Sequence, residues 1–251
     1  MRRFVPLALA TLLVGAGCSP ANADDLRLEI LGTRPHDVTA YTQGLEIVGA
    51  VLYEGTGNVG QSRLRTIDLH TGRVLAHADL DPDFFGEGIT VVGPNVWQIT
   101  WQNQVAVERD AVTLTERRRV RYDGEGWGVC AQPDRLVMSD GSNRLTFRDR
   151  TTFASTGSVQ VDTDARFNEL ECTRDGSVWA NAWPTDTIVR IDPNRGTVTG
   201  RVDAAELRKR IPGTAAVEVL NGIAQIPGTD RFLITGKYWP LMFEVRFIGQ
   251  N

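Results

Sequence analysis

The sequence has few of the residues on which metal sites and disulfide scaffolds depend. Its 251 residues include three cysteines and three histidines. His36, His70 and His77 do not have the spacing of metal ligands, so a zinc hydrolase is not expected. The chain also lacks a serine nucleophile elbow and a glycine-rich phosphate loop. We therefore predict no metal, no nucleotide and no other cofactor.

Clustered positive charge is also missing. The formal net charge is −4, and only two of the 27 basic residues are lysines, Lys209 and Lys237. The one basic run, at 117–121, is typical of a solvated strand face rather than of a binding patch. Because nucleic-acid binding depends on clustered Lys and Arg, nucleic acid is not an expected partner.

Long apolar runs are limited to one segment near the N-terminus. Two arginines precede residues 4–14, which are apolar but too few to span a bilayer. This pattern predicts a secretory signal peptide at 1–23, and a lipoprotein-type leader that ends before Cys18 is the alternative. The remainder, 24–251, should form one domain. We expect this domain in the periplasm or outside the cell, free or tethered by lipid at Cys18, with no membrane span.

The sequence does contain a pattern that recurs five times. Each copy begins with an amide or an acid, usually followed by glycine and an apolar residue, and continues with further short apolar stretches. The leading residues are Gln43, Glu87, Glu125, Asn168 and Asn221. Four short strands in each repeat of roughly 40 to 45 residues are typical of propeller blades, whose small sheets must stack to cover their apolar faces. We therefore expect an all-β fold, a five-bladed β-propeller.

The two ends of the chain are expected to close this ring. The last repeat supplies only three strands, and residues 26–31 are the candidate for the fourth. Such pairing would tie the ends together and remove an exposed strand edge. A longer interval before the fifth repeat is explained by a short helix at 204–210 followed by a loop. We expect the closed ring to be a monomer.

The first strand of each propeller blade lines the central channel, so the five leading residues should form one ring of three amides and two acids. Glu87 and Glu125 come from neighbouring repeats, which favours one carboxyl keeping the other protonated. Loops that follow the second strands should overhang the same mouth, and Lys237 lies in one of them. A lysine in a chain so rich in arginine suggests a need for a compact ammonium there.

Five of the six tryptophans fall into two groups. Trp97 and Trp179 share a second-strand position and are expected in the core. Trp101, Trp127 and Trp183 fall near the mouth. These three fit either a core position or the wall of a substrate pocket.

Two cysteines remain if Cys18 is removed with the leader. Cys130 and Cys172 both lie just past the inner strands of neighbouring repeats. Export would permit a disulfide between them, but two buried free thiols are the favoured interpretation.

Eight short motifs run in order along the chain after the leader. They are HD at 36–37, TQGL at 42–45, FGEGIT at 85–90, GEGWG at 124–128, SDGS at 139–142, NELE at 168–171, LNGI at 220–223 and TGK at 235–237. Together these motifs resemble the plant and bacterial glutaminyl cyclase family. The resemblance implies a five-bladed propeller that converts the N-terminal glutamine of peptides or proteins to pyroglutamate and releases ammonia, without metal or cofactor.

The resemblance also implies roles for single residues. Glu87 is implied as the acid/base that moves a proton from the attacking amine to the leaving ammonia. Asn168 and Lys237 resemble groups that bind the substrate amide or its developing oxyanion, and Gln43 resembles a group that orients the substrate. Tyr41 stands where many relatives have Phe. The aromatic walls are implied to include Trp101, Trp127 and Trp183.

Two other functions remain open at this stage. A propeller of this family could bind peptide termini without catalysis. A metal-dependent, lactonase-like propeller could instead hold a divalent ion with the carboxylates and amides of the channel ring. Ammonia release from a peptide that begins with glutamine, with and without a chelator, distinguishes these alternatives.

Overall fold

The computed structural model describes residues 23–213 and 216–249. Within them, twenty strands and one helix, α1 (Ala205–Lys209), make up the regular structure. The expected all-β fold is confirmed. Of the predicted leader at 1–23, only Ala23 is among the described residues. Cys18 lies outside them. No helix in the described part is long and apolar enough to cross a membrane.

Three antiparallel sheets of four strands each follow one another along the chain. The first contains β2 (Thr42–Val48), β3 (Val51–Thr56), β4 (Arg63–Asp68) and β5 (Val74–Asp79). The second contains β6 (Gly86–Val92), β7 (Asn95–Thr100), β8 (Val105–Asp110) and β9 (Glu116–Arg121). The third contains β10 (Val129–Ala131), β11 (Leu136–Ser139), β12 (Arg144–Arg148) and β13 (Ser155–Gln160).

The other eight strands form one sheet in the order β14-β15-β16-β17-β1-β20-β19-β18. Its first group is β14 (Arg166–Cys172), β15 (Val178–Trp183), β16 (Thr187–Asp192) and β17 (Thr197–Asp203). Its second group is β18 (Leu220–Gln225), β19 (Arg231–Gly236), β20 (Leu241–Gly249) and β1 (Asp24–Pro35).

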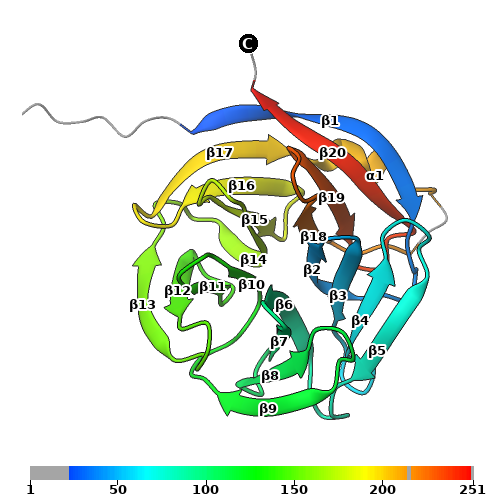
Figure 1. The fold of residues 1–251 in the computed structure, drawn as a ribbon. Coiled ribbons are helices and arrows are strands. Elements are labelled where there is room, and N and C mark those ends of the chain that lie inside the picture. The colour runs from blue at the N-terminus through cyan, green and yellow to red at the C-terminus, as the bar shows by residue number, and fades with distance from the viewer. Residues whose placement is uncertain (1–22, 214–215, 250–251) are drawn as a thin grey trace, which may run out of the picture.

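Strand β1 joins these two groups. It pairs with β20 in antiparallel fashion and, through its first three residues, with β17 in parallel. The pairing with β17 was not predicted from the sequence, and β1 is longer than the expected segment 26–31. The two ends of the described chain thus lie side by side (Figure 1).

The sheets surround a common centre (Figure 1). Their innermost strands, β2, β6, β10, β14 and β18, contact one another in a circle. Apolar side chains between adjacent sheets form hydrophobic clusters, and the predicted core residues Trp97 and Trp179 are buried in two of them. Helix α1 falls within the predicted interval 204–210, and its Leu207 is buried in the same apolar cluster as Trp239. The inner strands are therefore surrounded by several apolar clusters that join neighbouring sheets.

Glycines allow the inner strands to approach closely. A Cβ atom on Gly44 would lie 2.5 Å from the backbone nitrogen of Ile89. One on Gly88 would lie 2.7 Å from the backbone nitrogen of Val129. Real Cβ atoms do not approach backbone atoms this closely, so no side chain fits at either position.

In the third sheet, the glycine that contacts the next inner strand is not the one that the sequence pattern indicates. The close contact is made by Gly128, where a Cβ would collide with the Asn168 carbonyl. The sequence pattern aligns the third repeat on Gly126 and so predicts Glu125 in the central ring. The true equivalent of Gly88 is two residues later, so Glu125 does not occupy the ring position that was expected.

Cys130 and Cys172 form a disulfide between β10 and β14, with their Cα atoms 5.4 Å apart. The favoured interpretation of two free thiols is therefore wrong. The physical reason is that both cysteines lie on inner strands, which converge more closely than the repeat spacing alone reveals.

Replacing both cysteines in a Cys130→Ser, Cys172→Ser variant should destabilise the fold. The disulfide closes a loop across 42 positions, and cross-links of this kind typically contribute about 2–4 kcal/mol. Urea unfolding of both proteins measures the difference. Two titratable thiols from these positions in unfolded, unreduced wild-type protein would contradict the bond.

Candidate active site

One pocket of about 190 Å³ contains every residue that the sequence analysis proposed for catalysis and substrate binding. It is lined by Tyr41, Gln43, Phe85, Glu87, Trp101, Trp127, Asn168, Trp183 and Lys237. Pockets for drug-sized ligands are larger, roughly 300 Å³ or more, so this one suits a single amino-acid side chain. The roles of these residues stay predictions.

β-Bulges orient the polar residues at the starts of the inner strands. The register shifts between Thr42 and Gly44, Gly86 and Ile89, Phe167 and Leu170, and Leu220 and Ile223. A bulge leaves a residue unpaired and re-aims its side chain, and bulges are common beside active sites. The residues within these shifts include Gln43, Glu87, Asn168 and Asn221. Four of the five ring positions therefore share one backbone irregularity, whereas β10 begins only after Trp127.

Hydrogen bonds fix the orientation of Gln43. Asn221 Nδ2 donates to Gln43 Oε1 at 3.0 Å and to the Thr42 carbonyl at 2.9 Å. Gln43 Nε2 consequently faces Glu87 and donates to Glu87 Oε1 at 3.1 Å. Asn221 supports the site without lining the pocket. The sequence identified its repeat position but gave it no role.

Glu87 is buried, with 4% of its surface exposed. Burial raises the pKa of its carboxyl well above the ordinary value; Lys237 opposes this rise and Glu125 adds to it. Burial, rather than the neighbouring acid expected from the sequence, is thus the main cause. Among the described residues, none donates a hydrogen bond to Glu87 Oε2 or to Asn168 Oδ1. Both oxygens are free to accept hydrogen bonds from a ligand.

Glu125 has a different position and a different charge. Its Oε2 accepts hydrogen bonds from the indole nitrogens of Trp127 (3.0 Å) and Trp101 (2.7 Å), and its Oε1 accepts one from Gln102. These hydrogen bonds, that from Trp127 most of all, outweigh the effect of desolvation and lower the pKa of Glu125. Glu125 is therefore an ionised acid that links two walls of the pocket.

Lys237 enters the pocket from the turn after β19 and is 4% exposed. Its ammonium lies 4.4 Å from the centre of the Tyr41 ring, within cation–π distance. Burial lowers the pKa of Lys237, while Glu87 and Glu218 act in the opposite direction. The pocket thus brings a compact cation near an acid that burial tends to keep protonated.

Aromatic rings form the rest of the wall. Phe85 contacts Tyr41 and Trp101 edge to face, with ring centres 5.9 and 5.7 Å apart. Trp127 and Trp183 meet in the same way at 5.5 Å. Phe85 was not predicted as a site residue, although it begins the motif FGEGIT. The three mouth tryptophans therefore line the pocket, and the alternative of a core position does not hold for them.

Small residues make room for these rings. A Cβ atom on Gly57 would lie 2.6 Å from the Phe85 ring, and one on Gly141 would collide with the Trp127 indole. Gly141 also has a φ of +77°, which favours glycine. Gly57 directly follows β3, and Gly141 lies two residues after the end of β11. Their size is set by the aromatic ring that lies beside them.

In the part of the chain that the structure describes, no group of three or more His, Cys, Asp or Glu side chains is arranged to hold a metal ion. The lining of the pocket supplies one carboxyl, two side-chain amides and one ammonium. An ammonium beside the carboxyl disfavours a second cation at the same place.

Comparison with known proteins gives a consistent result. The family model of glutamine cyclotransferases matches residues 4–247. Glutaminyl-peptide cyclotransferase of Arabidopsis thaliana is 34% identical over 269 aligned positions, which cover 98% of this chain and 84% of the plant protein. The crystal structure of Myxococcus xanthus glutaminyl cyclase is 35% identical, covers 91% of this chain and 100% of its own, and has a TM-score of 0.82.

A more distant structure shares only the fold. A protein of unknown function from Bacteroides thetaiotaomicron is 12% identical and covers 88% of this chain and 75% of its own, with a TM-score of 0.56. The family match and the two closer relatives extend over nearly the whole chain. The chain therefore belongs to the glutamine cyclotransferase family.

Proposed function

We propose that this protein is a glutaminyl-peptide cyclotransferase that converts the N-terminal glutamine of peptides or proteins to pyroglutamate and releases ammonia. The observation that carries the proposal is the pair of unpartnered buried acceptors, Glu87 Oε2 and Asn168 Oδ1, in an aromatic pocket beside Lys237. An N-terminal glutamine brings the matching donors, because its amine and its side-chain amide both carry N–H groups. The names of the two close relatives support the same activity.

The reaction needs no nucleophile from the protein. The substrate's own amine attacks the side-chain carbonyl carbon, a carbon–nitrogen bond forms, and the amide nitrogen leaves as ammonia. Glu87 takes the proton lost by the amine and returns it to the leaving nitrogen. A raised pKa suits this exchange, because a general acid/base works best when its pKa is near the working pH.

The other groups orient the substrate and stabilise charge. Lys237 and Asn168 bind the substrate amide, and the ammonium of Lys237 offsets the negative charge that develops on its oxygen. The three tryptophans, with Phe85 and Tyr41, hold the side chain in the folded rotamer from which the ring closes. Such positioning can supply much of the rate enhancement of an intramolecular reaction.

We further propose that the domain at 24–251 is a single five-bladed β-propeller. Each of the five inner strands begins one blade, and β1 completes the last blade by pairing with β20. The proposed enzyme is exported by the leader at 1–23, acts as a monomer and uses no metal. Cleavage before Cys18 would instead leave a lipid tether.

Glu87→Gln should abolish most of the activity while the fold is retained. The amide matches the carboxyl in shape but cannot exchange the proton, a role typically worth about 100-fold to 10,000-fold in rate. Ammonia release from a peptide that begins with glutamine measures the loss. Glu206→Gln on helix α1 is the control and should remain active. Near-normal turnover by the Glu87 variant would refute the assignment.

Lys237→Met should lower kcat/KM and move its acid limb to higher pH. Lys237 lowers the pKa of Glu87, so removing the ammonium raises that pKa and delays ionisation of the base until a higher pH. Lys209→Met, which alters the only other lysine, should leave the profile unchanged. An acid limb that stays in place or moves to lower pH would contradict the coupling.

Ammonia release should persist after exhaustive treatment with a chelator. The expected reason is that Lys237 supplies the positive charge which a metal would otherwise provide. Loss of activity that returns on adding a divalent metal would favour the lactonase-like alternative. Tight binding of a glutamine-initiated peptide without ammonia release would favour the non-catalytic one.

A further inference from the structure

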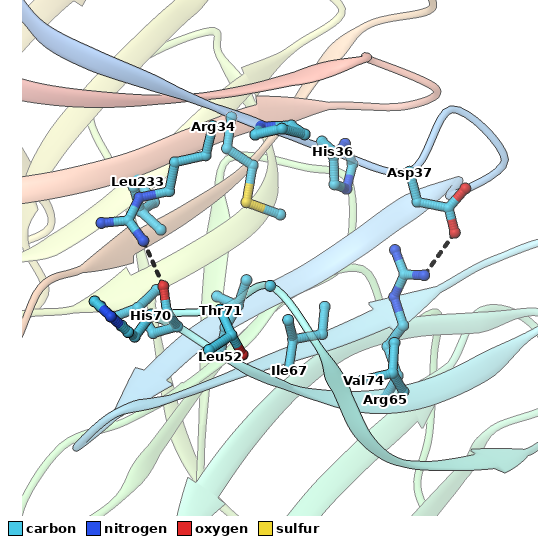
Figure 2. Close-up of a pocket in the computed structure, with 14 residues that line it drawn as sticks. Arg34, His36, Asp37, Leu52, Arg65, Ile67, His70, Thr71, Val74 and Leu233 are labelled. Atoms are coloured by element: carbon cyan, nitrogen blue, oxygen red, sulfur yellow. Dashed lines mark hydrogen bonds and ion pairs between the residues drawn. The ribbon is translucent and has the colours of Figure 1, made fainter.

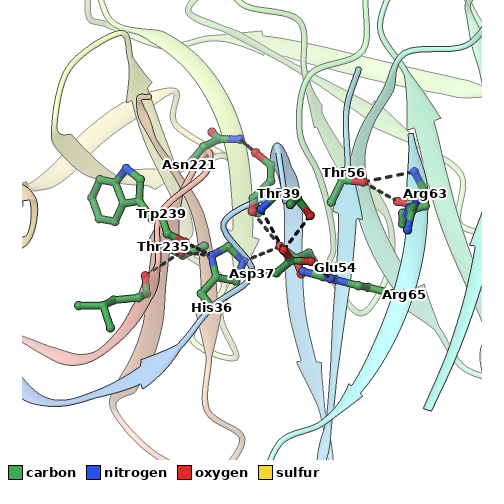
Figure 3. Close-up of polar contacts among 12 residues, drawn as sticks. His36, Asp37, Thr39, Glu54, Thr56, Arg63, Arg65, Asn221, Thr235 and Trp239 are labelled. Atoms are coloured by element: carbon green, nitrogen blue, oxygen red, sulfur yellow. Dashed lines mark hydrogen bonds and ion pairs between the residues drawn. The ribbon is translucent and has the colours of Figure 1, made fainter. Parts of the chain in front are cut away.

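A largely buried group of charged side chains lies next to Trp239, two residues after Lys237 (Figure 3). It consists of His36, which follows β1, Glu54 on β3 and Arg65 on β4, with Asp37 at its outer side. The side chains of His36 and Glu54 are 1% and 0% exposed. None of these four residues lines the catalytic pocket, so the proposed reaction leaves them without a role.

Both nitrogens of the His36 ring face hydrogen-bond acceptors. Nδ1 lies 2.7 Å from the Trp239 carbonyl and 3.2 Å from the hydroxyl oxygen of Thr235. That hydroxyl donates its own hydrogen to the Leu241 carbonyl at 3.0 Å, so it can only accept from His36. Nε2 lies 2.9 Å from Glu54 Oε1. Both nitrogens must therefore carry hydrogen if Glu54 is ionised.

Glu54 has the partners of an ionised carboxylate. Its Oε1 also accepts from the Thr42 hydroxyl at 2.8 Å, and its Oε2 accepts from Arg65 Nε at 2.7 Å. Burial alone would raise the pKa of Glu54, but His36, Arg65 and Thr42 lower it to about 2. Arg65 also binds Asp37 at 2.6 Å, so a protonated His36 balances two cations against two anions.

The same group connects two parts of the catalytic pocket. The Trp239 carbonyl that His36 binds is two residues from Lys237, and Thr42, which binds Glu54, directly precedes Gln43. Tyr238, between Lys237 and Trp239, has a φ of +61°, a region that side chains of its size rarely adopt. The turn thus depends on outside contacts to keep its shape. One is the bond from the Tyr238 nitrogen to the Ala40 carbonyl.

We propose that His36, as an imidazolium, is a positioning residue of the cyclisation site that locks the Lys237 turn to the strand carrying Gln43, and that loss of its proton lowers activity. This inference rests on the proposed function. A neutral ring could donate from only one nitrogen. The Trp239 carbonyl or Glu54 would then lose its donor, and the buried group would carry an unbalanced negative charge.

Solvent reaches one side of this group through a separate cavity of about 520 Å³ (Figure 2). His36, Asp37 and Arg65 line this cavity together with Arg34 and His70, so a proton can leave without opening the catalytic pocket. Exposed His77 on β5 is the cross-strand partner of Arg65.

The expected pH dependence has a definite sign. Burial alone would lower the pKa of His36, but the charge and hydrogen bond of Glu54 and the bond to Trp239 outweigh it and raise the pKa above its ordinary value. The contacts are then complete below the ordinary pKa of histidine and are lost as pH rises through the raised pKa. Wild-type kcat/KM should therefore decline on the alkaline side with the titration of His36.

The test combines nitrogen NMR of histidine-labelled wild-type protein with pH profiles of wild type and His36→Gln. We expect both His36 nitrogens to be protonated at neutral pH, and one component of the alkaline decline to share the NMR midpoint. His36→Gln should lose that component and reduce kcat/KM by between about 10-fold and 100-fold, in line with the cost of misplacing catalytic groups. His70→Gln, which alters an exposed ring on the same cavity, is the control and should behave as wild type.

Three results would overturn the proposal. One is a neutral His36 ring at neutral pH, and another is a wild-type profile with no component at the NMR midpoint. The third is a His36→Gln protein that melts at lower temperature but keeps the wild-type kcat/KM and profile, since that pattern indicates a structural role alone. The NMR titration needs no turnover, so it tests the protonation of His36 independently of activity. Absence of ammonia release by the wild-type protein would instead refute the proposed function.

Discussion

The inner strands approach one another so closely that their contacts determine where the polar residues of the site and the two cysteines lie. Gly44 and Gly88 touch the backbone of the next inner strand and leave no space for a side chain. Polar groups just before these contacts must turn out of the regular ladder, and the β-bulges at the strand starts accomplish this. The same convergence brings Cys130 within bonding distance of Cys172. The candidate site and the cross-link are therefore both consequences of one packing geometry.

Burial then decides the charge of each carboxyl. Glu87 has a single hydrogen bond from Gln43 and a raised pKa, whereas Glu54, equally removed from solvent, has three partners and a lowered one. Glu125 lies near the mouth and is ionised because indole and amide groups donate to it. A buried acid titrates according to the donors it is given. The fold can thus keep one carboxyl available for proton exchange while holding others fixed as anions.

Repeat phase in the sequence predicted the all-β fold and the leading polar residues of the inner strands, whereas the choice of Glu87 over Glu125 and the inclusion of Tyr41 came from the family resemblance. A residue at the same place in successive repeats faces the same centre, which is how Gln43 and Asn168 could be placed without coordinates. Repeat phase failed at Glu125, since GEGWG offers two alignments that differ by two residues and only the contact at Gly128 chooses between them. It also could not reveal the disulfide, which depends on a distance between strands, or the hydrogen bonds of His36, whose partners come from distant segments.

The proposed chemistry explains why so much structure serves so small a pocket. When nucleophile and electrophile belong to one substrate residue, the protein chiefly selects a conformation and moves a proton. Selecting one rotamer of the substrate requires rigid pocket walls. Aromatic rings that pack edge to face and bind Glu125 are more rigid than aliphatic side chains would be. Proton transfer demands that Lys237 keep a fixed distance from Glu87, because its field lowers the pKa that burial raises. The Lys237 turn is strained at Tyr238, so contacts outside the pocket, such as those of His36, must set that distance.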